Sequence, residues 1–179
     1  RWLGDVYKSK VKNLDIGKLE HKTPEYKKIA PNSRIPALVL DNGEVILETT
    51  AICRYLECFH PEPNLFGDNA DEIAQIEMWY SRISFELMMP LMHGFRHTHP
   101  HMSALENQNN KFGLAQRELA VKSLKYYDEV MADKEYIACN KFSYADIQAV
   151  TSLQFLVRLN KIDIHLSLIH ISEPTRPLD

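Results

Sequence analysis

Four histidines close together are the most conspicuous candidates for chemistry in this sequence. They are His93, His97, His99 and His101, and neutral imidazole is a common metal ligand. Pro100 stands between the last two and prevents helical pairing of their rings. No carboxylate or cysteine lies among the four. The pattern therefore favours a solvated loop, or one wall of a substrate pocket, over a metal site, and we predict no metal.

A serine and an aspartate form a second candidate pair. Ser143 and Asp146 together suggest the nucleophile and carboxylate of a hydrolase. Their spacing of three residues also matches a helix-start box, with aspartate in place of the usual Glu or Gln. We predict the structural role, at the start of a helix over residues 143–160.

Cysteine content and overall composition exclude several classes of protein. Cys53, Cys58 and Cys139 are too few and too scattered for a disulfide framework or a zinc site. The 179 residues carry a formal charge of −3, which argues against a nucleic-acid binder with a broad basic face. No apolar run approaches the ~18–20 residues of a membrane span. We expect a cytoplasmic protein that contacts neither nucleic acid nor membrane.

The first third of the chain is predicted to alternate strands and helices. Asn42 and Gly43 form the centre of a turn between two apolar runs, which is a strong hairpin signal. Thr23 and Thr49 each stand at the N-cap position of an expected helix. The predicted strands are residues 6–13, 35–40 and 45–47, and the predicted helices are residues 24–29 and 50–58.

The rest of the chain is predicted to be helical. Prolines and a glycine without periodicity mark a linker over residues 61–68. Pro90 is expected to kink or end the first long helix. Its apolar stripe consists of Ile73, Ile76, Trp79, Tyr80, Ile83 and Leu87. The expected segments are helices over residues 72–92, 112–131 and 143–160, with a polar loop over residues 97–110.

This order of motifs resembles a cytosolic glutathione transferase of bacterial or theta-like type. Ile35-Pro36 opens a strand, and Glu48-Thr49 opens a helix after the hairpin, as in that family. The segments MWYSRISFEL, FRHTHP and FSYADIQAV are similar to bacterial members. The resemblance implies an α+β fold: a partial thioredoxin-like N-terminal domain followed by an all-α C-terminal domain. The expected domains are residues 1–60, a linker at 61–68, and 69–165.

The resemblance also implies a glutathione-binding site. It makes the bond before Pro36 cis and pairs the main chain of Ile35 with the cysteinyl part of glutathione. It also implies that Thr49, at a helix N-terminus that favours anions, binds the α-carboxylate of the γ-glutamyl group, and that Glu48 binds the α-ammonium group.

Two further residues are expected at the glycyl carboxylate of glutathione. His21 precedes a basic residue, Arg34, by thirteen positions, a spacing that resembles theta-like members. Either side chain is expected to face the carboxylate, Arg34 through a charge-assisted bond.

The catalytic residue is not identified in the sequence. The resemblance implies a Tyr, Ser or Cys that activates the thiol, and we expect it before residue 1. The implied function is conjugation of glutathione to electrophiles, or glutathione-dependent reduction, by a homodimeric detoxification enzyme with glutathione as co-substrate. The alternative is a non-catalytic binding or interaction module with the same fold. The acceptor substrate is not predicted.

The last residues have a different character. The string LSLIHISEPTR, residues 166–176, resembles a translated sequencing-library adapter. We expect residues 166–179 to be an artefactual tail that makes no substantial core contact.

Overall fold

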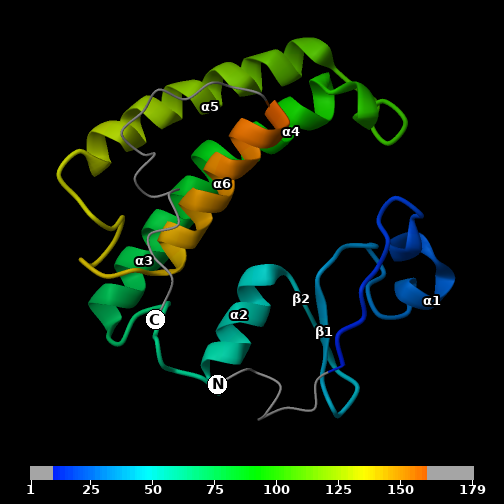
Figure 1. Ribbon diagram of the computed structural model, residues 1–179, viewed down its shortest axis with the longest axis horizontal. Helices are drawn as coiled ribbons and strands as arrows, with labels where there is room; N and C mark the ends of the chain where they lie inside the picture. The colour runs from blue at the N-terminus through cyan, green and yellow to red at the C-terminus, as the bar shows by residue number, and fades with distance from the viewer. Residues whose placement is uncertain (1–9, 161–179) are drawn as a thin grey trace. The chain divides into compact units, whose positions relative to one another are not determined.

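The computed structural model describes residues 10–160, and the chain divides into two compact units after Glu62 (Figure 1). The expected tail at 166–179 lies outside the described residues, as do residues 6–9 of the first predicted strand. Each unit has its own architecture: the first contains a two-stranded sheet with short helices, and the second is helical.

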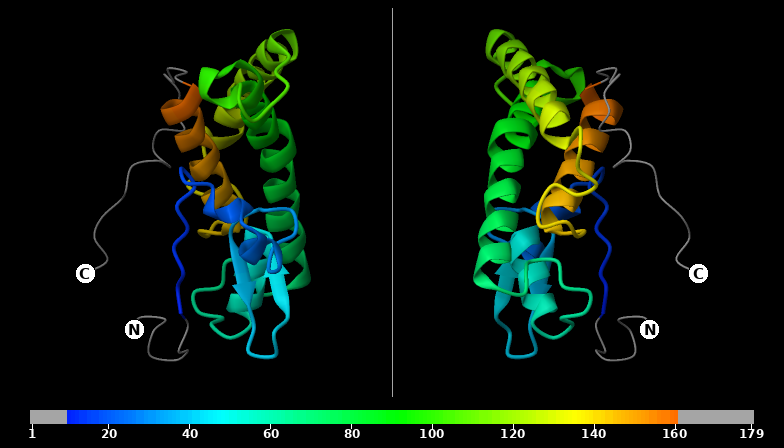
Figure 2. Two further views of the ribbon diagram at one scale, coloured as in Figure 1. Left: turned by 90° about the vertical axis from the view of Figure 1, so that its right-hand side faces the viewer. Right: turned by 90° about the vertical axis from the view of Figure 1, so that its left-hand side faces the viewer.

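The centre of the first unit is a β-hairpin followed by a helix. Strands β1 (Ala37–Val39) and β2 (Val45–Leu47) pair antiparallel, and α2 (Thr49–Glu57) follows directly. At the turn, the N–H of Gly43 donates to the Leu40 carbonyl at 2.9 Å, and Gly43 has φ 85°. Glycine adopts this left-handed conformation without steric cost, so the predicted hairpin is confirmed (Figure 2).

The segment before the hairpin forms only short helical turns. They are η2 (Glu20–Lys22) and α1 (Pro24–Lys27), and the Thr23 hydroxyl accepts the N–H of Tyr26 at 3.3 Å, which confirms the predicted cap. Residues 10–13 are not a strand in the described structure, so that part of the prediction is wrong. Strand formation requires a pairing partner elsewhere in the chain, and the lysine-rich sequence does not specify one.

The second unit consists of packed helices. Helix α5 (Asn110–Met131) packs along α4 (Met89–Thr98), and α6 (Tyr144–Asn160) packs along α3 (Ala70–Ile83) and α4 (Figure 1). The 3₁₀ turn η4 (Pro100–Met102) follows α4.

The first long helix does not run uninterrupted through Pro90. Helix α3 ends at Ile83, a π-helical turn η3 (Ser84–Met88) follows, and Pro90 lies in the first turn of α4. Proline has no N–H to donate, and its ring would clash with a carbonyl one turn earlier. The wider π turn before it absorbs both effects, and helical backbone resumes through Thr98. The polar loop predicted over residues 97–110 is therefore partly wrong.

The core of the second unit contains most of the predicted apolar stripe. Ile76, Ile83 and Leu87 are at most 2% exposed, whereas Ile73 is 43% exposed and lies outside the core. Asp146 is buried at the start of α6, and its carboxylate accepts the N–H and hydroxyl of Ser143, both at 2.8 Å. The predicted helix-start box is confirmed.

Candidate functional site

The open end of the hairpin brings two predicted motifs to one place in the first unit. Ala37 pairs with Leu47. Beyond that pair, Ile35 and Pro36 lead into β1, and Glu48 and Thr49 follow β2. The chain therefore enters β1 and leaves β2 at the same end of the ladder, where α2 begins.

Ile35 offers its main chain at this end of the hairpin. The Ile35–Pro36 bond is cis, as predicted. The Ile35 side chain is 41% exposed, and β1 begins only at Ala37. The backbone of Ile35 thus lies outside the ladder and makes none of the β1–β2 hydrogen bonds.

The turn into α2 holds Glu48 in an unusual conformation. Glu48 is the N-cap residue with φ 71°, a left-handed backbone that is uncommon for a non-glycine residue. Its carbonyl accepts the N–H of Ile52 at 3.0 Å, so the helix is in place from the first turn. Thr49 is the first helical residue rather than the cap, which corrects the predicted helix start at residue 50.

The side chains of Glu48 and Thr49 are exposed, and no hydrogen bond or ion pair holds either of them within residues 10–160. They stand at the N-terminus of a nine-residue helix, where N–H groups point outward and the helix dipole favours an anion. The two charges of an α-amino acid ligand each have a complementary group here: its carboxylate can face the helix N-terminus, and its ammonium group can face the carboxylate of Glu48.

The hydrogen bonds that hold Arg34 within residues 10–160 are made by its main chain. The Tyr26 hydroxyl donates to the Arg34 carbonyl at 2.7 Å, and the Arg34 N–H donates to Oδ1 of Asn32 at 3.3 Å. The Arg34 side chain is exposed. Tyr26 fixes the segment before Ile35, and this role was not predicted from the sequence. The one available signal was the position of Tyr26 in the first turn of the helix that Thr23 caps.

His21 lies in the turn η2 and is half-buried. Its Nδ1 is buried and has no hydrogen-bond partner among the described residues. No hydrogen bond or ion pair joins His21 and Arg34 within residues 10–160. Of the six predicted site residues, the hairpin end therefore groups four, and the placement of His21 and Arg34 beside them stays a prediction. The four are Ile35, Pro36, Glu48 and Thr49.

The histidines of α4 do not form a metal centre in the described part of the chain. Within residues 10–160, no group of three or more His, Cys, Asp or Glu side chains is placed to hold a metal ion. Instead His93 and His97 pack their rings against Phe112, with centroids 5.5 and 5.1 Å away. None of the described helices is both long and apolar enough to cross a bilayer.

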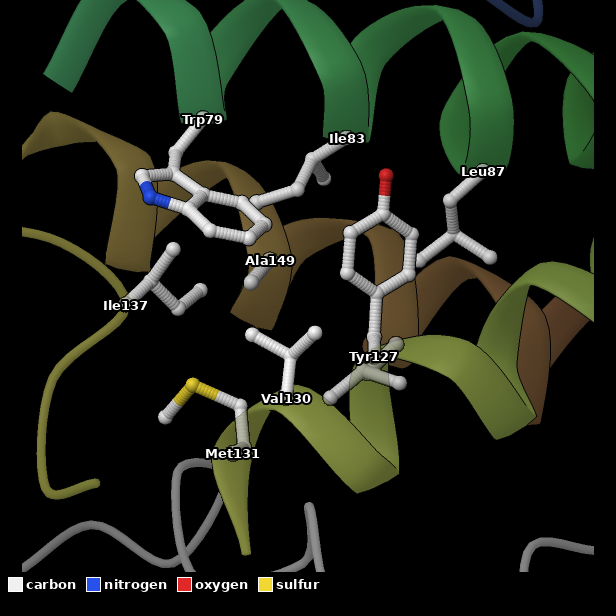
Figure 3. Close-up of a pocket in the computed structure, with 9 residues that line it drawn as sticks. Trp79, Ile83, Leu87, Tyr127, Val130, Met131, Ile137 and Ala149 are labelled. Carbon is white, nitrogen blue, oxygen red and sulfur yellow. The ribbon is translucent and has the colours of Figure 1, made fainter. Parts of the chain in front are cut away.

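A cavity in the helical unit is too small for a substrate. It measures about 10 Å³, close to the minimum that holds one water molecule. Figure 3 shows Trp79, Ile83 and Leu87 of α3 and η3 facing Tyr127, Val130 and Met131 of α5 across it. The surface that lines the cavity is apolar, and the Tyr127 hydroxyl donates to Glu86, so we interpret the cavity as a small packing defect.

Among the described residues, the titratable side chains with a clearly shifted pKa lie in the helical unit, and the three that follow bond neighbouring segments to one another. Burial, followed by a 2.9 Å hydrogen bond to Glu86, raises the pKa of Tyr127 far above its ordinary value. Lys141 bonds Asp68 at 2.8 Å and Glu72 at 2.5 Å, and these bonds raise its pKa. The bond from Lys141 is also the main cause that lowers the pKa of Glu72. Each shift follows from an internal contact, so none of the three marks a catalytic acid or base.

Comparison with known families gives a match in each unit. Residues 6–58 match the family model described as glutathione S-transferase, N-terminal domain, and residues 78–163 match glutathione S-transferase, C-terminal domain. These matches confirm the predicted fold class: a thioredoxin-like N-terminal domain with a helical C-terminal domain.

Three relatives illustrate the range of similarity. Glutathione S-transferase 2 of Saccharomyces cerevisiae is 34% identical over 144 residues, which are 79% of this chain and 62% of the yeast protein. The crystal structure of a glutathione S-transferase domain-containing protein of Marinobacter aquaeolei VT8 has a TM-score of 0.78 and 31% identity, covering 88% of this chain and 78% of that one. Elongation factor 1-gamma 2 of Oryza sativa subsp. japonica is 39% identical over 69 residues, 38% of this chain and 16% of the rice protein.

Proposed function

This chain belongs to the glutathione S-transferase family, and we propose that the open end of its hairpin binds the γ-glutamyl-cysteinyl part of glutathione. The observation that supports the proposal is that Ile35 lies just before β1, and Glu48 and Thr49 just after β2, at the same end of the antiparallel hairpin. A peptide backbone, an ammonium group and a carboxylate each have a complementary partner there.

Each partner has a distinct role in this proposal. The exposed main chain of Ile35 pairs with the cysteinyl residue as an added strand would. The hydroxyl of Thr49 donates to the α-carboxylate at the start of α2, and the carboxylate of Glu48 accepts from the ammonium group. Arg34 and His21 are proposed to face the glycyl carboxylate at the other end of the tripeptide.

The proposed reaction is transfer of the glutathione thiolate to a small electrophile, or reduction that uses the same thiolate. In the transfer, the thiol gives up its proton and a sulfur lone pair forms a bond to an electrophilic carbon. In a substitution, the leaving group departs with the electron pair of its bond to that carbon; in an addition, the displaced π pair takes up a proton. We assign the activation of the thiol to no residue among those described. The chain spans 62% of its yeast relative, and the activity is proposed for the whole protein.

Substitution of Thr49 tests the binding site. In Thr49→Ala, we expect glutathione to bind about 1–3 kcal/mol more weakly, because a hydrogen bond to a charged group is lost. Titration calorimetry on the whole protein measures the difference. Thr151→Ala is the matched control, since the exposed Thr151 hydroxyl bonds only carbonyls of its own helix α6. Equal affinity in Thr49→Ala and wild type would place the ligand elsewhere.

The alternative function is a non-catalytic interaction module, and the similarity to elongation factor 1-gamma supports it. The two functions differ in turnover. A whole protein that binds glutathione through Thr49 but consumes no thiol with a panel of electrophiles, peroxides and disulfides would favour the module.

We propose that the whole protein is a homodimer that associates through its helical unit. Met78, Phe85 and Met89 follow one another at helical spacing along α3, η3 and α4, and are 41%, 67% and 43% exposed. The guanidinium of Arg82 lies 5.0 Å from the Tyr126 ring, which joins this stripe to α5. Light scattering of Phe85→Glu should report a monomer, and a dimer unchanged by that charge would contradict this interface.

A further inference from the structure

The peptide group between Arg34 and Ile35 is held by a tyrosine hydroxyl. The hydroxyl of Tyr26 donates to the carbonyl of Arg34 at 2.7 Å. Within residues 10–160 the one cis bond is Ile35–Pro36, so the bond between Arg34 and Ile35 is trans. In a trans peptide, the carbonyl of one residue and the N–H of the next lie in one plane and point in opposite directions. The Tyr26 hydroxyl therefore directs the N–H of Ile35 away from the Tyr26 ring.

Tyr26 is itself anchored in the short helix α1. Its N–H donates to the Thr23 hydroxyl at 3.3 Å, and its carbonyl accepts the N–H groups of Ile29 and Ala30, both at 2.9 Å. Ala30 is completely buried, and Tyr26 is half-buried. Because the main chain of Tyr26 is bonded on both sides, its hydroxyl reaches the Arg34 carbonyl from a fixed position.

The main chain differs sharply between Arg34 and Ile35. Oδ1 of Asn32 accepts the N–H of Arg34 at 3.3 Å, so both main-chain polar groups of Arg34 are bonded. In contrast, neither the N–H nor the carbonyl of Ile35 makes a hydrogen bond within residues 10–160. Ile35 is also 41% exposed. Among the described residues, the chain thus presents an unpaired N–H whose direction is set by a bonded neighbour.

We propose that Tyr26 is a positioning residue for glutathione, and that its hydroxyl holds the N–H of Ile35 in the direction that bonds the carbonyl of the cysteinyl residue. This inference rests on the proposed function and deepens it, because it assigns preference for the cysteinyl main chain to a side chain that acts through Ile35. An N–H that is already directed needs no ordering when the ligand binds, so the affinity is higher than with a peptide that turns freely.

A purely structural role for the Tyr26 hydroxyl leads to a different expectation. If the bond only holds the segment between α1 and β1 together, its loss weakens every ligand at the hairpin end by a similar factor. If the bond directs the Ile35 N–H, its loss weakens only those ligands that carry a carbonyl for that N–H. The bond is exposed, so water competes for both groups and its contribution to stability is small.

Two ligands that differ in a single group separate these roles. γ-Glutamylcysteinamide carries the cysteinyl carbonyl, whereas γ-glutamylcysteamine has a hydrogen in place of the whole carboxamide. Both lack the glycyl carboxylate that is expected at Arg34 and His21. In the whole protein, Tyr26→Phe should bind γ-glutamylcysteinamide about three- to tenfold more weakly and γ-glutamylcysteamine within about twofold of wild type. Titration calorimetry measures both affinities, with displacement titrations where binding is weak.

Two further variants serve as controls. Tyr55→Phe also removes a tyrosine hydroxyl from the first unit, but the Tyr55 hydroxyl makes no hydrogen bond within residues 10–160. This variant should bind both ligands as the wild type does. Thr49→Ala should weaken both ligands by a similar factor, because both carry the γ-glutamyl carboxylate. A selective loss in Tyr26→Phe beside a general loss in Thr49→Ala would support the proposal.

Other outcomes would overturn the proposal. A similar loss for both ligands in Tyr26→Phe would make the hydroxyl a structural support, and unchanged affinity for both would leave it without a role in binding. If Tyr26→Phe did not fold, the bond would serve the stability of the unit, against the proposal. Failure of the proposed function gives a different result: the wild type binds neither ligand, or Thr49→Ala binds both as tightly as the wild type, and the inference then falls with the site.

Discussion

The hairpin end of the first unit and the helix starts of the second unit use similar residues for different purposes. Glu48 and Thr49 form an acid–hydroxyl pair at the start of α2, and Ser143 and Asp146 form another at α6. The first pair is exposed, and its side chains have no hydrogen-bond partner among the described residues. The second pair is at most 1% exposed and fully bonded. An unsatisfied exposed pair suits a ligand, whereas a satisfied buried pair stabilises the fold.

The two units also differ in how many hydrophobic side chains they bury. Among the described residues, Ala30 is the only buried hydrophobic residue of the first unit, and the other buried ones lie in the second unit. Substitutions in the second unit should therefore lower the free energy of unfolding most. Substitutions at the hairpin end should change ligand binding more than stability.

The largest expected effect is that of Asp146→Ala. The carboxylate accepts from the N–H and hydroxyl of Ser143 and from the N–H of Ile137 at 2.9 Å, all of them buried. Its removal leaves three donors without partners, so we expect a loss of about 3–5 kcal/mol in the free energy of unfolding. Urea denaturation measures this value. A loss no larger than that in Thr49→Ala would contradict the distinction between the two pairs.

A second, smaller effect is expected where α4 and α5 cross. A Cβ on Gly113 would lie 2.7 Å from Cγ2 of Thr98 and 2.8 Å from Cβ of His97. We expect Gly113→Ala to cost about 1–3 kcal/mol through overpacking, although alanine is the better helix former. Thermal unfolding followed by circular dichroism measures the loss. An increase in stability would show that the helices separate without cost.

The hairpin glycine gives the matched comparison. A Cβ on Gly43 would meet nothing within 4 Å, so only its φ of 85° opposes a side chain. We expect Gly43→Ala to cost about 1 kcal/mol, from backbone conformation alone. In contrast, Gly43→Asn should be nearly neutral, because asparagine tolerates this region better. Equal losses for alanine and asparagine would indicate a steric cause instead.

The sequence predicted best those features that depend on neighbouring residues. The hairpin at Asn42-Gly43, the Thr23 cap and the Ser143–Asp146 box all follow from local turn and capping chemistry. The strand over residues 6–13 was not found in its described part, because strand pairing depends on distant segments. The π turn before Pro90 was not predicted either, since a proline pattern indicates a break but not how the backbone absorbs it.

In the candidate site, too, the features that depend on neighbouring residues were predicted better than those that depend on distant groups. The grouping of Ile35 with Glu48 and Thr49 follows from the hairpin, which is local. The roles of His21 and Arg34 were implied by resemblance alone, and their position depends on how a flexible side chain meets a ligand.

The smallest expected effect concerns the ion pairs of Lys141. In Lys141→Met, the bonds to Asp68 and Glu72 are lost, but these side chains are partly exposed and solvent screens their attraction. We expect a small decrease in Tm at pH 7 with a defined pH dependence. The bond from Lys141 lowers the folded pKa of Glu72 below its ordinary 4.5, so this contribution is complete above that value and is lost as the pH falls through the folded pKa.

The pKa of Lys141 is raised by the same bonds, so its contribution is complete below its ordinary 10.5 and is lost only at still higher pH. The difference in Tm between wild type and Lys141→Met should thus be constant between about pH 5 and 10 and should shrink in acid. Lys122→Met, on the exposed face of α5, is the matched control and should show no such profile. A difference that persists at pH 2 would mean that Lys141 acts through the packing of its aliphatic chain rather than through its charge.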